Sequence, residues 1–518
     1  MSKHYDVAVL GTEIGALAAA ALLARRSWRV LVLGHGSRGT TYTYDGIPLA
    51  RRPSSLLSGA SPAWTRVLVE LAQSQTFRRR VEPLDPMLQL LLPRRRFDLP
   101  PDDVAFGREC DREFPEVRRV IDDLYADLAR TNAAADAAFE RDITMPPGGF
   151  WERREVSRAM VGLPHLDAPV DALLTEFPRD HDYRIVVTTP ARFATDLAAD
   201  IPAFALARLH GAWTRGVGRL PGGDDELREF LLERVKAHGG DVALGDRAVS
   251  LVHKGGKVTG LLPHGEEHPI GVQFLVTDGP ARSLLELAEG FSLSRRAQDD
   301  LPRVTPRTSR FVVSIVARDR GLPAMLGHDA FIVPASGDVG PVMVQRWSAS
   351  EARGAKPYAT LPEKSSLLIC ETLFDADSPV ALSRARKAVL AVVERFLPFL
   401  EKHYLLVDSP HDGEPLWDYR SGAKTPVDRT QLRHTGGSID AEPMIPQWEV
   451  EPASIHGLCG EGLRSPLANG FVTGRTAMPA LGQEGQLLAA WGVARTITKT
   501  DRKKERMRRE LWSKVELG

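Results

Sequence analysis

Cysteine is scarce in this sequence, and long apolar runs are missing from it. Of the 518 residues only three are cysteine, and Cys110, Cys370 and Cys459 lie far apart with no CxxC pair. This pattern argues against a zinc site, an iron–sulfur cluster and a disulfide framework, so we expect no metal. No stretch of 18 apolar residues occurs, which predicts that no helix spans a membrane.

Net charge and catalytic signatures are lacking as well. Lys and Arg together number 67, as do Asp and Glu, so the formal net charge is zero. A neutral total argues against a nucleic-acid partner and against a polybasic membrane protein. The nucleophile-elbow, zinc-protease and P-loop signatures do not occur, so the sequence assigns no catalytic side chain.

What is present is the composition of a folded protein. Hydrophobic residues make up 43% and charged residues 26%, which is ordinary for a soluble chain. The length corresponds to roughly two to four domains. The N-terminal residues MSKHYDVAVLG enter a strand at once, which leaves no room for a signal peptide, so a cytoplasmic location is the default expectation.

The first 33 residues predict a strand, a turn, a helix and a second strand. Residues 5–10 (YDVAVL) and 29–33 (RVLVL) are apolar runs suited to buried parallel strands, and residues 11–28 (GTEIGALAAAALLARRSW) combine a turn with an Ala- and Leu-rich helix. This order is the start of a dinucleotide-binding fold.

The glycine fingerprint of that fold is altered here. The positions of G-x-G-x-x-G carry Gly11, Glu13 and Ala16, and Gly15 lies one residue before the third place. A carboxylate at position 13 adds bulk and repels a pyrophosphate. Gly34 stands where an acidic residue usually accepts hydrogen bonds from a ribose. Two readings stay open: a unit that binds a dinucleotide, and one that serves only as scaffold.

Two later blocks have a related pattern. Residues 221–278 predict a helix ended by paired glycines, a strand, a hairpin and an apolar strand. Residues 469–500 predict a strand, a glycine-bearing turn, a glycine-rich loop and an Ala-rich helix.

These three blocks, in this order, resemble the flavin-containing amine oxidase and phytoene (carotenoid) desaturase superfamily. Residues 85–103 are similar to the early helical insertion of the desaturase-type members. The resemblance implies an α/β fold with a Rossmann-like FAD/NAD(P)-binding domain, a mixed-sheet substrate domain and a helical insertion. The first unit also resembles the Rab GDP-dissociation inhibitors, which share the fold without using FAD. The expected division is a dinucleotide-binding domain in three parts (1–75, 206–295 and 446–500), a helical insertion (76–205), a substrate-domain sheet with its covering helix (296–445) and a basic C-terminal helix (501–518).

The resemblance also implies which residues would meet FAD, although several differ from the family pattern. Arg38-Gly39 lacks one of the paired glycines, Ala248 would flank the adenine, and Gly474-Arg475 would lie near the ribitol. The candidate cofactor-binding residues are Gly11, Glu13, Gly15, Arg38, Gly39, Ala248, Gly474, Arg475, Gly482 and Gly485. Because an acid enters at 13 and a base at 475, we expect these two side chains to pair in the pyrophosphate place; the alternative is that both point to solvent.

Two functions follow from this sequence. One is an FAD-dependent oxidoreductase that removes hydride from a long apolar or lipid-like molecule. The other is a non-catalytic relative that has lost FAD and binds a lipid or another protein. The basic segment 501–518, with an apolar edge of Met507, Leu511 and Trp512, allows either a peripheral membrane contact or a solvated terminal helix.

Overall fold

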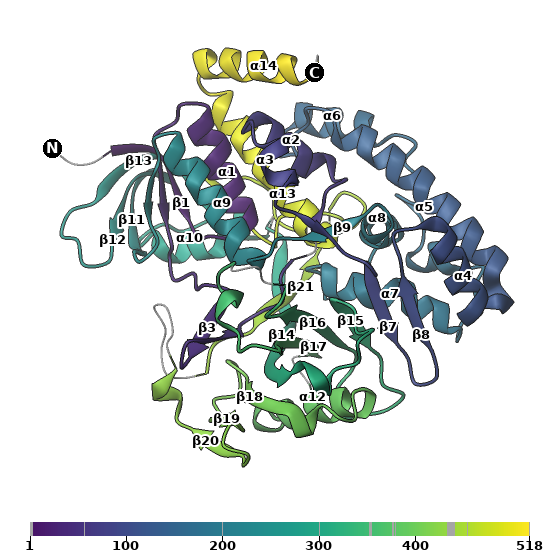
Figure 1. Cartoon of the computed structure of the whole chain (residues 1–518). Helices are drawn as coiled ribbons and strands as arrows, with labels where there is room; N and C mark the ends of the chain where they lie inside the picture. Colours follow the sequence, from purple (N-terminus) through teal and green to yellow (C-terminus); the bar gives the residue numbers. More distant parts are fainter. Residues whose placement is uncertain are drawn as a thin grey trace.

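The computed structural model describes residues 4–516 except 56, 199, 300, 352–354, 376–377, 379, 433–440 and 453. Two sheets organise the chain, with helices around both (Figure 1). The smaller main sheet has seven strands, and five of them run parallel. Its order is β10 (Asp241–Ala243), β2 (Val30–Leu33), β1 (His4–Leu10), β13 (Ile270–Thr277), β12 (Lys257–Pro263) and β11 (Ala248–Lys254), with β22 (Gly470–Val472) also pairing with β13.

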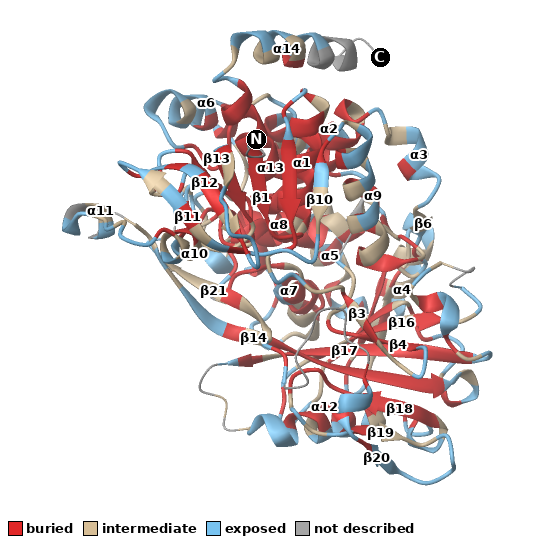
Figure 2. Ribbon diagram, turned by 90° about the vertical axis from the view of Figure 1, so that its left-hand side faces the viewer, coloured by how far each residue is buried: buried red, intermediate tan, exposed pale blue. Residues whose placement is uncertain are grey.

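Helix α1 (Ile14–Arg25) lies at the centre of this Rossmann-like domain. Its residues from Ile14 to Ala24 are all buried, because Ala side chains let neighbouring helices approach closely. It packs against α9 (Gly223–Ala237) and α13 (Gly482–Thr498). Figure 2 shows the buried residues concentrated in α1, α13 and β1. Other helices at this domain are α2 (Pro62–Glu70), α3 (Ser74–Arg78), α10 (Ala281–Leu287) and α14 (Arg502–Glu516).

The larger sheet is mixed and has ten strands. The 16-residue β14 pairs with three other strands in antiparallel fashion. The order is β20 (Thr425–Val427), β19 (Leu416–Asp418), β18 (Tyr404–Asp408), β14 (Arg303–Arg318), β17 (Ser365–Asp375), β16 (Val342–Ser348), β15 (Asp329–Ile332), β7 (Leu88–Leu91) and β8 (Arg96–Leu99), with β21 (Ile445–Glu451) beside β14. Helix α12 (Leu382–Phe396) packs against β14, β15 and β16.

A helical region adjoins the end of the larger sheet where β7 and β8 lie (Figure 1). It contains α4 (Asp103–Glu113), α5 (Arg118–Phe139), α6 (Phe150–Met160), α7 (Asp182–Ala194) and α8 (Ala203–Thr214). Short pieces complete the chain: the hairpin β3 (Thr41–Tyr44) and β4 (Ile47–Ala50), the strands β5 (Leu57–Ser58), β6 (Glu82–Pro83) and β9 (Val217–Arg219), and α11 (Arg295–Asp299).

The expected fold class is confirmed: a Rossmann-like domain, a mixed-sheet domain and a helical insertion. Within 76–205, β7 and β8 extend the larger sheet rather than joining the helices. None of the helices in the described part of the chain is long and apolar enough to cross a lipid bilayer. Among the same residues, no group of three or more His, Cys, Asp or Glu is arranged to hold a metal ion.

Candidate functional site

The turn between β1 and α1 holds a carboxylate from a distant part of the chain. Gly11 has a φ of +105°, and a Cβ on it would lie 2.0 Å from the carboxylate oxygens of Asp278, so only glycine fits. The backbone N–H of Glu13 donates to Asp278 at 2.8 Å. Because a helix N-terminus attracts negative charge, Asp278 occupies the place where this fold would receive a phosphate.

The side chain of Glu13 is held by two arginines. Its carboxylate lies 2.6 Å from the Arg52 guanidinium and 3.0 Å from that of Arg475. The predicted pair of Glu13 and Arg475 is thereby confirmed, whereas the role of Arg52 was not anticipated. Burial alone would raise the pKa of Glu13, but the two arginines outweigh it and hold that pKa well below its usual range.

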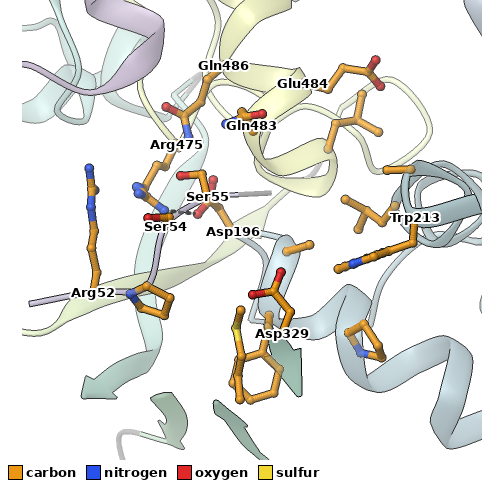
Figure 3. A pocket seen from close by; sticks show the side chains of 18 of the residues that line it. Arg52, Ser54, Ser55, Asp196, Trp213, Asp329, Arg475, Gln483, Glu484 and Gln486 are labelled. Atoms are coloured by element: carbon orange, nitrogen blue, oxygen red, sulfur yellow. Dashed lines mark hydrogen bonds and ion pairs between the residues drawn. The ribbon is translucent and has the colours of Figure 1, made fainter. Parts of the chain in front are cut away.

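Both arginines have further acidic partners. Arg475 pairs with Asp196 at 2.8 Å, as Figure 3 shows, and Arg52 lies 3.7 Å from Asp224. A third arginine, Arg228, donates to the Thr12 hydroxyl and, at 2.9 Å, to the Arg38 carbonyl oxygen. The positive charges around the start of α1 are therefore compensated by carboxylates of the protein itself.

The end of β2 is closed by backbone. A Cβ at Gly34 would lie 1.9 Å from the carbonyl oxygen of Leu244, so no acidic side chain has room there. The next residue, His35, accepts a hydrogen bond at 3.3 Å from the backbone N–H of Ala248. The backbone N–H of Ala248 is therefore occupied by His35, although the resemblance implies that Ala248 flanks an adenine.

The remaining predicted residues fall into two sets. Arg38 lies 3.0 Å from Glu442, and the Gly39 carbonyl accepts from Arg51 at 3.2 Å, so both belong to a network beside the β3–β4 hairpin. The other glycines permit close backbone approach. If each glycine carried a Cβ, the distance from that Cβ to the nearest backbone carbonyl oxygen would be 2.2 Å for Gly15, 1.7 Å for Gly474, 2.1 Å for Gly482 and 2.3 Å for Gly485.

A cavity lies beyond Arg475, between the start of α13 and the larger sheet (Figure 3). The space free of protein atoms here is about 1130 Å³, a volume that includes the open mouth of the cavity. Helices α7 and α8 supply Phe193, Leu209 and Trp213 to its wall, and β15 and β16 supply Phe331 and Met343. The wall is therefore largely apolar, as is usual for small-molecule sites.

The arginines of this cavity are paired with carboxylates. Arg208 contacts Glu484 at 2.7 Å, and Arg310 contacts Glu371 at 2.6 Å. Arg215, also in the wall, pairs with an aspartate on α5 at 2.8 Å. Asp329, also in the wall, contacts His328 at 2.9 Å and accepts from Gln345 at 3.0 Å, so the described wall holds a carboxylate but no unpaired arginine.

Three polar atoms of the wall are unpartnered. Trp213 Nε1, Gln483 Nε2 and Gln486 Oε1 are buried and have no hydrogen-bond partner among the residues that the structure describes. Trp213 and Gln486 are 3% and 4% exposed. Buried polar groups usually have partners, so these two donors and one acceptor point to a ligand with a few polar atoms. Sequence reasoning missed them because an isolated Trp or Gln carries no motif.

Asp278 makes stability depend on pH. Burial and the nearby Glu13 charge raise the pKa of Asp278 to about 6. The backbone N–H groups of Glu13 and Thr12 lower it, but by less. Because a raised carboxyl pKa favours the protonated folded state, Asp278 costs stability as pH rises from about 4 to 7. We expect Asp278→Asn, which keeps an acceptor oxygen, to gain about 1–2 kcal/mol over wild type across that range. Melting temperatures of Asp278→Asn and wild type, measured in this pH range, test the prediction. If the advantage of the variant does not grow as pH rises, the prediction is contradicted.

This fold, a Rossmann-like domain joined to a mixed-sheet domain with a cavity between them, matches that of solved oxidoreductases of the flavin amine oxidase type. Several solved structures share it at low sequence identity. An oxidoreductase from Methanosarcina mazei is 16% identical, with a TM-score of 0.60 over 94% of this chain and 99% of that chain.

Two further solved structures have the same fold. A putrescine oxidase variant with redesigned cofactor binding is 15% identical, with a TM-score of 0.57 over 97% of this chain and 100% of that chain. The PF1083 protein from Pyrococcus furiosus is 14% identical, with a TM-score of 0.53 over 97% of each chain. No protein-family model and no curated protein matches the sequence. At these identities the similarity establishes the fold.

Proposed function

We propose that this chain is a small-molecule-binding protein that keeps the oxidoreductase fold without holding FAD in the phosphate place of that fold. The observation that carries the proposal is the Glu13 carboxylate, clamped by Arg52 and Arg475 beside the start of α1. A pyrophosphate there would meet this carboxylate and that of Asp278, and both arginines are already neutralised. Burying like charges together without a free cation is costly.

The adenosine end supports the same conclusion. Gly34 leaves no room for a ribose-binding acid because the Leu244 carbonyl lies against it. The Ala248 N–H donates to His35 rather than outward. Phosphate, ribose and adenine contacts are therefore all altered, and the residues present do not fit FAD.

The cavity indicates what the ligand is like. Its arginines are all paired with carboxylates, so an anionic ligand would be buried without a partner, at a cost of several kcal/mol. Its apolar wall and three unpartnered polar atoms suit an uncharged, largely apolar molecule with one or two hydrogen-bonding groups. A long-chain alcohol or primary amide has this chemistry, in keeping with the lipid-like partner expected from the sequence.

Two measurements test this function. The purified protein should lack flavin absorption and retain no added FAD in equilibrium dialysis; stoichiometric retention would refute the proposal. A long-chain primary amide should bind at least about ten-fold more tightly than the carboxylate of equal chain length, because no free cation awaits the carboxylate. Equal or stronger carboxylate binding would contradict the ligand class.

A variant pair locates the ligand. Ala212 lines the cavity, so Ala212→Phe fills part of it and should abolish amide binding. Ala129, on the exposed face of α5, provides the matched control Ala129→Phe, which should bind as wild type does. Loss of binding in both variants, or in neither, would place the ligand elsewhere.

One observation favours an FAD-dependent oxidoreductase as a second candidate. Gly482 and Gly485 keep the loop that would run beside a flavin ring, and the residues between them line the cavity. Bound flavin would supply the hydride acceptor that this chain's side chains do not provide. Retention of FAD in the dialysis experiment would select this alternative.

A further inference from the structure

Helix α6 begins with two aromatic side chains that face solvent. Phe150 is 72% and Trp151 69% exposed, and their rings lie 5.3 Å apart at centroids. Val161, just after the helix, is 80% exposed. Val156, Ala159 and Met160 supply the buried face of the same helix. The exposed aromatic pair is therefore not required for packing α6 onto the protein.

Two arginines share the outward face with the aromatic pair. Positions 150, 154 and 158 are spaced by four residues, so Phe150, Arg154 and Arg158 lie along one stripe of the helix. The Arg154 guanidinium lies 5.9 Å from the centroid of the Trp151 ring. Neither Arg154 nor Arg158 forms an ion pair with a described residue.

The acidic residues of α6 are neutralised from other elements. Glu152 pairs with Arg464 at 3.0 Å, and Glu155 pairs with Arg495 at 3.2 Å. The outward stripe therefore carries positive charge without compensation by its own helix. Burial would raise the pKa of Glu152, but Arg464 and two backbone N–H groups lower it to about 2, so Glu152 stays ionised and paired at neutral pH.

We propose that this stripe, defined as Phe150, Trp151, Arg154, Arg158 and Val161 and called the α6 face, binds an anionic lipid bilayer. Aromatic rings insert at the headgroup level, and arginines attract the phosphates of anionic lipids. A protein partner fits less well. Two aromatic side chains contribute roughly 300–500 Å² of contact, below the ~800 Å² per partner of a standard interface.

A second basic element lies at the same end of the molecule. Both views place α14 and α6 together at one end (Figures 1 and 2), and Arg508 of α14 contacts Asp142, eight residues before α6, at 2.8 Å. In the part of α14 whose side chains the structure describes (502–510), the exposed cations are Arg502, Lys503, Arg506 and Arg509, of which the last two pair with Glu510 and Glu505. The side chains of Leu511 and Trp512 lie outside the described residues. Positive charge thus extends beyond α6 at this end of the molecule.

This surface is separate from the cavity. The start of α13 lines the cavity, while Arg495 near its end contacts Glu155 of α6. The two features therefore lie toward opposite ends of one helix, and membrane binding stands or falls independently of the proposed ligand.

Vesicle sedimentation tests the α6 face with the full chain. Binding to phosphatidylcholine vesicles that contain one third phosphatidylglycerol should exceed binding to pure phosphatidylcholine by about ten-fold or more, and should fall with added salt. Phe150→Ser/Trp151→Ser and Arg154→Gln/Arg158→Gln should each reduce it by about ten-fold or more. Unchanged binding in both double variants would overturn the proposal.

Matched controls lie on the other domain. Phe399 is 69% exposed, like Trp151, and Arg384 and Lys387 are exposed on α12. Phe399→Ser and Arg384→Gln/Lys387→Gln should bind vesicles as wild type does; equal loss in these controls would refute a specific face. Analytical ultracentrifugation of wild type gives a second check. A dimer dissolved by the Phe150→Ser/Trp151→Ser variant would assign the α6 face to a second copy of the chain instead.

Discussion

Glu13→Gly should let the start of α1 bind pyrophosphate more strongly than the wild-type protein does, because it removes one of the two carboxylates there and leaves that of Asp278. The change leaves Arg475 with Asp196 and Arg52 with the more distant Asp224, at 2.8 and 3.7 Å. We expect the free energy of unfolding to fall by about 1–3 kcal/mol without added anion, less than for a fully buried pair because the side chain is partly exposed and partners remain. Millimolar pyrophosphate should recover much of that loss, measured as melting temperature.

A second buried pair near the other end of α1 supplies the control. Arg26 and Glu70 are almost fully buried, with a contact of 2.6 Å. Glu70→Gln should also lower the melting temperature, yet pyrophosphate should not restore it, because no vacant anion place results. A wild-type protein that responds to pyrophosphate as strongly as Glu13→Gly would show that Arg52 and Arg475 are not neutralised by Glu13.

The first unit of the fold could be predicted because its signals are local. The apolar runs 5–10 and 29–33 and the Ala-rich segment between them specify strand, helix and strand within 30 residues. The structure places β1 at His4–Leu10, α1 at Ile14–Arg25 and β2 at Val30–Leu33. The pairing of Glu13 with Arg475 was also predictable, because two unusual charges of opposite sign stand at positions that the fold brings together.

The rest of the site depends on pairings that the sequence does not display. Asp278 reaches α1 because β13 lies beside β1 in parallel, which brings the end of each strand to the same edge. Leu244 closes on Gly34 because β10 pairs with β2 in the same way. Arg52 lies in a loop whose path is set by tertiary packing. Such contacts join residues far apart in sequence, and no periodicity or motif marks them.

The strand pairing of the larger sheet could not be predicted from the sequence either. β14 pairs with β21 along its first half and with β18 along its second, while β17 covers it from Thr308 to Arg318. A sequence can indicate that such a run is a buried strand, but the register depends on which neighbours bury it. The wall of the cavity depends on this sheet as well, because β15 and β16 place Phe331 and Met343 in it. The unpartnered polar atoms of Trp213, Gln483 and Gln486 could therefore be identified only from the structure.

Arg208→Met should strongly destabilise the protein. The Arg208 side chain is 2% exposed and contacts both oxygens of Glu484, at 2.7 and 2.8 Å. Burial would raise the pKa of Glu484, and Arg208 lowers it. Without Arg208 the carboxylate keeps the Ser61 hydroxyl, at 2.7 Å, as its hydrogen-bond donor among the described residues, and the nearby charge of Arg215. We expect a loss of about 3–5 kcal/mol in the free energy of unfolding at neutral pH.

The sign of the pH dependence identifies the cause. In Arg208→Met the pKa of Glu484 should rise above its unfolded value, so the folded state binds a proton that the unfolded state has lost, and the deficit should grow between about pH 5 and 8. Arg208→Met/Glu484→Gln removes the orphan charge and should recover most of the stability, since Asp136 retains Arg215 at 2.8 Å. Melting curves of both variants across that range decide it. A deficit that is independent of pH and persists in the double variant would mean that Arg208 stabilises the cavity by packing, not by neutralising Glu484.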